Sequence, residues 1–180
     1  MKRRPGIMTV FLCLLIGMSL VLPLGQAAEM TKDLAVKYIL ATAKAARTVY
    51  VKSVLATAKK GGVKPDEYWE KKDHAIMLPA QFLKAVGAKI KDFELTLVGL
   101  TPLYKSNKPK TTAEVRVMKE LATGKKKVIT FQDGKYFKGM SADFAIAQSC
   151  ADCHNMHPNT TRKDWKKGDF MGAIIVRMKD

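Results

Sequence analysis

The spacing of apolar residues predicts a long amphipathic helix over Thr31 to about Lys60. Apolar residues recur three, four and seven positions apart on one face, whereas several lysines and Arg47 take the other faces. The apolar face is made by Ile39, Ala43, Ala46, Tyr50 and Val54. Thr31 is a suitable N-cap, and Gly61-Gly62 marks the end of the helix.

A second stretch of helical spacing begins at about Pro79, a residue well suited to the first turn of a helix. Its buried face is expected to hold Phe82, Leu83, Val86 and Ile90. Residues 93–97 then alternate with a period of two, which predicts a β-strand. Residues 63–73 and 105–110 are polar and rich in lysine, so we expect turns and exposed loops there.

Thr111 and Glu114 have the spacing of a capping box, which predicts a short helix that ends at Gly124. Its buried side would be formed by Val115, Met118 and Ala122.

A β-hairpin is predicted after this helix, with strands over residues 127–131 and 135–140. Asp133-Gly134 lies between them and is a strong turn signal. We expect a further helix from about Ser141 and a final buried strand over residues 171–178.

The order of these elements is helix, helix, strand, helix, hairpin, helix and strand. That order is typical of an α+β domain whose antiparallel sheet is flanked by helices. No internal repeat is visible in the sequence, and we expect residues 28–180 to form a single domain.

The first residues have the pattern of a targeting segment. Lys2-Arg3-Arg4 precedes an uncharged run over residues 8–24, and Gly25-Gln26-Ala27 follows as a small-x-small cleavage pattern. We therefore expect residues 1–27 to be a cleaved signal peptide and the rest of the chain to be periplasmic. The alternative is an uncleaved membrane anchor, for which the apolar run is slightly short.

The sequence Cys150-Ala151-Asp152-Cys153-His154 has the C-x-x-C-H spacing of a c-type haem attachment motif. Two thiols three positions apart can add to the two vinyl groups of one porphyrin, and the adjacent imidazole can bind the iron as an axial ligand. We therefore predict one covalent haem c, bound by Cys150 and Cys153, with His154 as the metal ligand.

Two other chemistries use cysteines at this spacing. An exported C-x-x-C is often a disulfide or a thiol-redox pair, and a zinc site could add His154 and His157 to the two cysteines. The histidine directly after Cys153, together with the export signal, favours haem over both. Cys13 lies within the predicted signal peptide and would be removed with it.

The other face of the iron has no obvious ligand in the sequence. The candidates are His74, Met77, Met140, Tyr50 and water. A histidine or methionine would close the site and suit electron transfer, whereas an open site would suit ligand binding. Each candidate also has a structural explanation, with His74 as a solvated surface residue and the methionines as core residues.

Two residues beside the motif are expected to support it. His157 is too close in sequence to the axial histidine to reach the other face of the iron, and we expect it to fix its loop through hydrogen bonds. Trp165 is expected to pack on the haem edge or in the core.

The chain has 32 lysines and arginines against 16 acidic residues, a formal charge of +16. Without Lys2-Arg3-Arg4 the charge is about +13. Nucleic acid is not an expected partner of an exported haem protein. The positive surface instead suits docking to an acidic redox partner or an anionic membrane surface, or serves solubility alone. Nothing in the sequence indicates the oligomeric state.

Four stretches of the sequence resemble one known family: residues 47–50, 78–82, 150–158 and 165–172. It is the single-haem c-type cytochrome domain with a PAS-like fold, long catalogued as a domain of unknown function. The family occurs in cyanobacterial and proteobacterial cytochromes and in sensory domains of bacterial chemoreceptors and kinases. The resemblance implies a five-stranded antiparallel sheet with flanking helices and a haem pocket against the sheet. It also implies that Cys150 and Cys153 form the thioethers and that His154 is the proximal ligand.

Two functions fit these observations. The first is a periplasmic single-haem electron carrier, and the second is a haem-based redox or gas sensor that acts through a separate partner protein. The sequence contains no recognisable set of catalytic residues, so we do not expect an enzyme.

Overall fold

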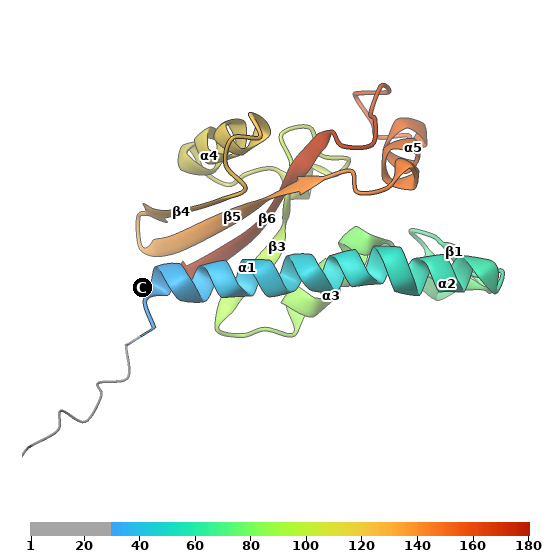
Figure 1. Cartoon of the computed structure of the whole chain (residues 1–180), viewed down its shortest axis with the longest axis horizontal. Helices are drawn as coiled ribbons and strands as arrows, with labels where there is room; N and C mark the ends of the chain where they lie inside the picture. The colour runs from blue at the N-terminus through green and yellow to red at the C-terminus, as the bar shows by residue number, and fades with distance from the viewer. Residues whose placement is uncertain (1–29) are drawn as a thin grey trace, which may run out of the picture.

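One continuous helical rod opens the part of the chain that the computed structural model describes, residues 30–180 (Figure 1). It consists of α1 (Lys32–Val49), a π-helical segment η1 (Tyr50–Val54) and α2 (Leu55–Lys60). The hydroxyl of Thr31 accepts a hydrogen bond from the Leu34 N–H at 3.2 Å. The predicted helix and its N-cap are therefore confirmed, whereas the predicted signal peptide lies outside the described residues.

The buried face of this rod differs from the predicted one. It is formed by Val36, Leu40, Ala43, Tyr50 and Leu55. Ala46 and Val54, which were expected on it, are exposed. The step of five residues from Tyr50 to Leu55 spans the π-helical segment, whose wider turn brings residues five apart onto the same side.

A four-stranded antiparallel sheet forms the centre of the described residues, in the order β3-β6-β5-β4. The strands are β3 (Phe93–Val98), β4 (Val128–Asp133), β5 (Tyr136–Phe144) and β6 (Phe170–Lys179). The last strand of the chain is thus inserted between β3 and β5, where it is buried on both faces from Gly172 to Arg177. The hairpin between β4 and β5 turns at Gly134, whose φ is 59°.

Helices cover both faces of the sheet (Figure 1). On one face, α1 and α3 (Pro79–Ala88) enclose Val36, Leu40, Ala43, Leu83, Leu95, Ile174 and Val176. On the other, α4 (Thr112–Ala122) encloses Val98, Val117, Met118, Leu121, Met140, Ala142, Ala173 and Ile175. The predicted α+β class is confirmed. The family resemblance implied five strands in the sheet, but the described residues place four there.

Short elements connect the layers. After the rod, β1 (Lys64–Pro65) pairs in parallel with β2 (Ala75–Ile76), and the 3₁₀ turn η2 (Trp69–Lys71) lies between them. A second 3₁₀ turn, η3 (Lys105–Asn107), follows β3. No helix within residues 30–180 has the length and apolar character needed to cross a membrane.

The predicted start of the last helix, at about Ser141, is wrong. Residues 141–144 continue β5 and pair with β6, and Ser141 also pairs with Val128 of β4. Helix α5 (Gln148–Met156) begins seven residues later. Burial between two neighbouring strands outweighs the local helical preference of this small-residue segment.

The face of α4 also differs from the prediction. Met118 is buried as expected, but Ala122 is exposed and Val115 is only half-buried. The buried side is instead formed by Glu114, Val117, Met118 and Leu121. A charged residue occupies a core position here, and the apolar pattern alone gives no sign of that.

Candidate functional site

Helix α5 presents the three motif residues on one side. Cys150, Cys153 and His154 stand three and four positions apart, a spacing that places them on the same face of a helix. Ala151, within the motif, is fully buried and anchors the helix. Cys150 is half-buried, Cys153 is exposed, and both thiols are free. The motif face is therefore open at Cys153 and partly buried at His154.

The loop after α5 packs a tryptophan against the imidazole of His154. The Asn155 side-chain amide donates to the Trp165 carbonyl at 3.0 Å and accepts from the Trp165 N–H at 2.8 Å. Trp165 is buried, and its ring meets the His154 ring edge-on, with 6.0 Å between centroids. The Arg162 guanidinium covers Trp165 at 4.1 Å from the ring centroid. Trp165 is thus a packing partner of the motif histidine, in line with its predicted packing role.

The surroundings of the motif bias its protonation. Burial lowers the pKa of His154, and the nearby His157 and Arg47 lower it further. A neutral imidazole has a free nitrogen lone pair, which is the form that binds metals. Cys153 is exposed as a residue, but the protein around its thiol partly desolvates it and so raises its pKa, and Cys150 and Glu67 add to this effect. The motif therefore favours a neutral histidine and a protonated thiol.

His157 is held in a polar cluster, as its predicted role in fixing the loop requires. Its Nδ1 accepts from the Asn159 N–H at 3.1 Å, so Nε2 carries the proton of the neutral ring and faces Glu67 at 3.4 Å. The hydroxyl of Tyr104 donates to the same carboxylate, which raises the pKa of Tyr104 to about 12. The cluster joins the end of α5 to the segments before β2 and η3.

A buried ion pair lies beside the motif and was not predicted. Arg47 Nη1 donates to Asp143 Oδ1 at 2.7 Å, and both side chains are about nine-tenths buried. Burial raises the pKa of Asp143, although Arg47 and Lys44 oppose this effect. Within residues 30–180 the buried Nε of Arg47 has no acceptor. A buried donor without a partner is uncommon and indicates a place for an acceptor group.

Arg47 could have been found from the sequence. It lies four residues after Ala43 and three before Tyr50, so it occupies the buried stripe of the rod and not one of the polar faces. A charged residue at an apolar position of a helix is a signal for a buried ion pair or a ligand contact.

The structure separates the four candidate ligands for the far side of the iron. Met140 is fully enclosed in the core under α4. His74 is exposed and has a left-handed backbone with φ of 52°. Tyr50 stacks on Phe82, and its hydroxyl donates to the Met77 carbonyl at 2.6 Å. The phenol of Tyr50 is therefore engaged by the backbone of Met77, a half-buried residue.

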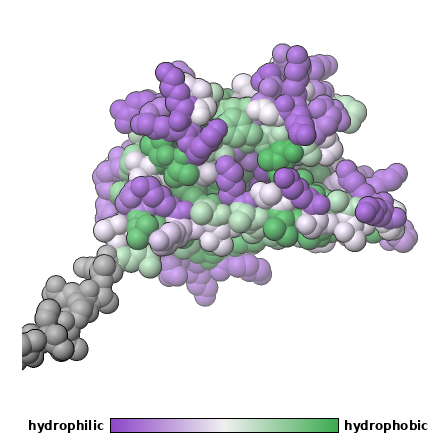
Figure 2. All heavy atoms as spheres, in the orientation of Figure 1, coloured by the Kyte–Doolittle hydropathy of each residue, from purple (hydrophilic) through white to green (hydrophobic). Residues whose placement is uncertain are grey.

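Helix α5 stands at the same end of the molecule as α2 and β1 (Figure 1). Lys59 and Glu67 come from this corner and are near enough to affect the pKa of Cys153. An open cavity of about 430 Å³ is lined there by Lys59, Gly62, Lys64 and Pro65. Figure 2 shows apolar side chains between the rod and the elements above it, surrounded by hydrophilic ones.

Among residues 30–180 no group of three or more His, Cys, Asp and Glu side chains has an arrangement that could hold a metal ion. The motif brings its three side chains to one helix face without closing them around a common point.

Comparisons with known proteins agree with this architecture. The crystal structure of the cyanobacterial heme-protein Tll0287 has the same fold, with a TM-score of 0.58 and 15% sequence identity. The match covers 83% of this chain and 97% of that one. No curated protein matches the sequence. The family model described as Tll0287-like matches residues 26–179, and the chain therefore belongs to the Tll0287-like family.

Proposed function

We propose that this protein binds one haem covalently and acts as an exported single-electron carrier. The observation that carries the proposal is the common face of α5 on which Cys150, Cys153 and His154 stand. Its fold relative Tll0287 is a heme-protein. A bound haem would supply the one-electron chemistry at its iron.

The thiols are suited to attachment. In thioether formation the S–H bond breaks, the sulfur bonds to the inner carbon of a vinyl group, and the hydrogen goes to the outer carbon. No oxidant or reductant is consumed in this addition. It requires free thiols, and both cysteines are free in the structure.

The neighbouring residues fit the rest of the group. His154 offers a neutral imidazole held against Trp165, which suits an axial ligand. The buried Nε of Arg47, without an acceptor in residues 30–180, suits a propionate carboxylate. A disulfide between the two cysteines would offer no acceptor to this N–H group, whereas a haem propionate would. Arg47 therefore favours a bound haem over a disulfide at the motif.

A carrier role is supported by the exposure of the attachment site. Cys153 is exposed, and the corner beside it contains the exposed lysines Lys59, Lys60 and Lys64, of which Lys59 and Lys64 line the open cavity there. Positive charge around an exposed redox group speeds encounters with an acidic partner. We therefore propose an acidic redox protein as the partner and the periplasm as the compartment.

Absorption and magnetic spectra of both oxidation states, with and without carbon monoxide, test this function. The protein should be produced from the full chain in a host with haem c maturation. A carrier stays low-spin in both states and does not bind carbon monoxide. High-spin iron, or ligand exchange on reduction, would contradict the carrier role and support the haem-sensor alternative.

Two histidine variants locate the ligand. H154A should lose the low-spin spectrum because the axial nitrogen is gone. H157Q is the matched control, since His157 is three residues away and is engaged by Glu67 and Asn159. An unchanged spectrum in H154A, or an equal change in both variants, would contradict the assignment of His154.

A further inference from the structure

A second cavity, of about 200 Å³, lies away from the motif helix between β3, α3 and the turn η3. Its charged lining comes from Lys84, Glu94, Lys108, Lys110 and Arg177. No residue of α5 lines it. Four cations thus face one carboxylate in a space that the proposed haem site does not use.

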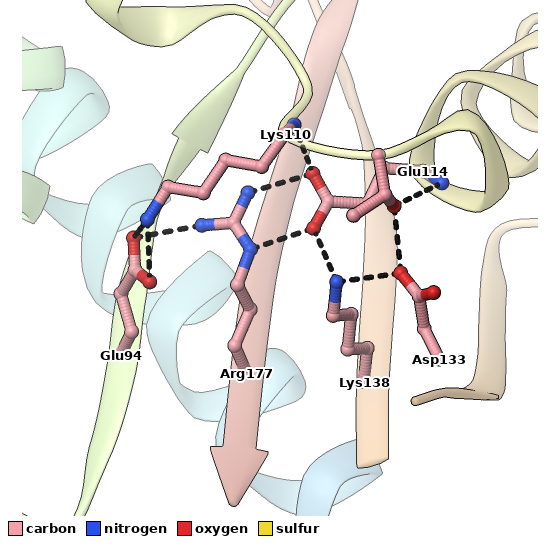
Figure 3. Close-up of polar contacts among 7 residues, drawn as sticks. Glu94, Lys110, Glu114, Asp133, Lys138 and Arg177 are labelled. Carbon is pink, nitrogen blue, oxygen red and sulfur yellow. Dashed lines mark hydrogen bonds and ion pairs between the residues drawn. The ribbon is translucent and has the colours of Figure 1, made fainter. Parts of the chain in front are cut away.

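The single carboxylate is already engaged. Glu94 accepts from Lys110 Nζ at 2.9 Å and from Arg177 Nη1 at 2.7 Å, as Figure 3 shows. Arg177 donates its remaining nitrogens to Glu114. The positive charges of Lys110 and Arg177 are therefore balanced within this network.

The other two cations have no such balance. Within residues 30–180 neither Lys84 nor Lys108 forms an ion pair with a carboxylate. Lys84 Nζ donates to Asn107 Oδ1 at 2.6 Å, and an ammonium group has three donors to satisfy. Burial lowers the pKa of Lys84, the direction expected for an ammonium that lacks a counter-charge.

We propose that this cavity binds a small oxyanion, a carboxylate or a phosphate, between Lys84 and Lys108. An oxyanion there would accept the free N–H groups of Lys84 and supply the missing negative charge. The hydroxyl of Ser106 also lines the cavity and can donate to the same anion. Since one water occupies about 30 Å³, the cavity volume of about 200 Å³ suits an anion of about phosphate or succinate size.

Isothermal titration calorimetry of the haem-loaded full chain tests the site. Chloride is the reference anion, and all titrations are made at the same ionic strength. Inorganic phosphate and succinate are the two probes. Saturable one-to-one binding of either supports the proposal, and the tighter probe identifies the class of anion. The absence of saturable binding for both overturns it.

Matched variants distinguish specific binding in the cavity from non-specific attraction of anions to the positively charged protein. K84Q should weaken binding of the tighter probe about tenfold or more, since one charge-assisted hydrogen bond is lost. K89Q removes the same charge from the exposed end of α3, outside the cavity, and should change affinity less than twofold. Equal weakening in both variants overturns the site. K108Q, at an exposed position, gives the same test if K84Q does not fold.

The two proposals fail separately. Anion binding is read as heat at a cavity that contains no motif residue, whereas haem attachment is read from the spectrum. A normal haem spectrum together with no anion binding would contradict the anion site and leave the haem proposal standing.

Discussion

Glu114 offers the most quantitative test of how this fold is held together. Its carboxylate is fully buried at the start of α4 and accepts four hydrogen bonds (Figure 3). The donors are Arg177 Nε at 2.7 Å, Arg177 Nη2 at 2.8 Å, Lys138 Nζ at 2.8 Å and the Lys110 N–H at 2.7 Å. The residue thus ties α4 to the two central strands of the sheet.

The expected magnitude follows from its pKa. Burial alone would raise the pKa of Glu114, but the hydrogen bonds from Arg177, Lys138 and the Lys110 N–H lower it from 4.5 to about 2. Each change of one in pKa corresponds to about 1.4 kcal/mol, so the ionised form stabilises the fold by about 3 kcal/mol. E114Q keeps the shape of the side chain but turns an amide N–H toward two cations. It should therefore lower the free energy of unfolding by about 3 to 5 kcal/mol.

The pH dependence has a definite sign. The folded pKa lies below the unfolded one, so the contribution of Glu114 is fully present above about pH 5. It is lost as the pH falls toward about 2. The difference in stability between the natural protein and E114Q should therefore shrink by about half between pH 7 and pH 3.

Urea denaturation of both proteins at several pH values measures this difference. E120Q is the control, because Glu120 lies on the same helix and pairs with Lys126 at the surface. E120Q should lower the free energy of unfolding by less than about 1 kcal/mol. A cost below about 1 kcal/mol for E114Q, or a difference that does not change between pH 7 and pH 3, would refute the reasoning.

Three further substitutions test single contacts. M140L should lower stability by less than about 1.5 kcal/mol and leave the haem spectrum unchanged, because Met140 is enclosed in the core; an altered spectrum would make Met140 a ligand. G139A should cost about 1 to 3 kcal/mol in thermal unfolding, because an added Cβ would come within 2.3 Å of Val36; an unchanged melting temperature would contradict this packing. N155A should speed amide exchange around Trp165, whose N–H and carbonyl it releases; unchanged exchange would contradict the anchor.

Local signals in the sequence were sufficient for much of the fold. The long helix, its Thr31 cap and the Gly134 hairpin depend on neighbours within a few residues, and the structure confirms all three. The end of β5 was missed because pairing with β4 and β6 decides it, and those partners lie far away in sequence.

The motif of the candidate site could be recognised in the sequence, but its surroundings could not. The order of Cys150, Cys153 and His154 already predicts one helical face. The position of Arg47 in the apolar stripe signals a buried partner, but that partner, Asp143, lies almost a hundred positions away, and no local pattern identifies it. For the same reason, only the structure could show that Tyr50 is engaged by Met77 and that Met140 is enclosed.

The mass of the purified chain after denaturation tests the central claim most directly. The expected mass exceeds that of the polypeptide by one haem, with no free thiol at Cys150 or Cys153. The double variant C150S/C153S should have the mass of the polypeptide alone. A natural protein that has two free or disulfide-bonded cysteines and no added mass, after production with the maturation system, would contradict the account.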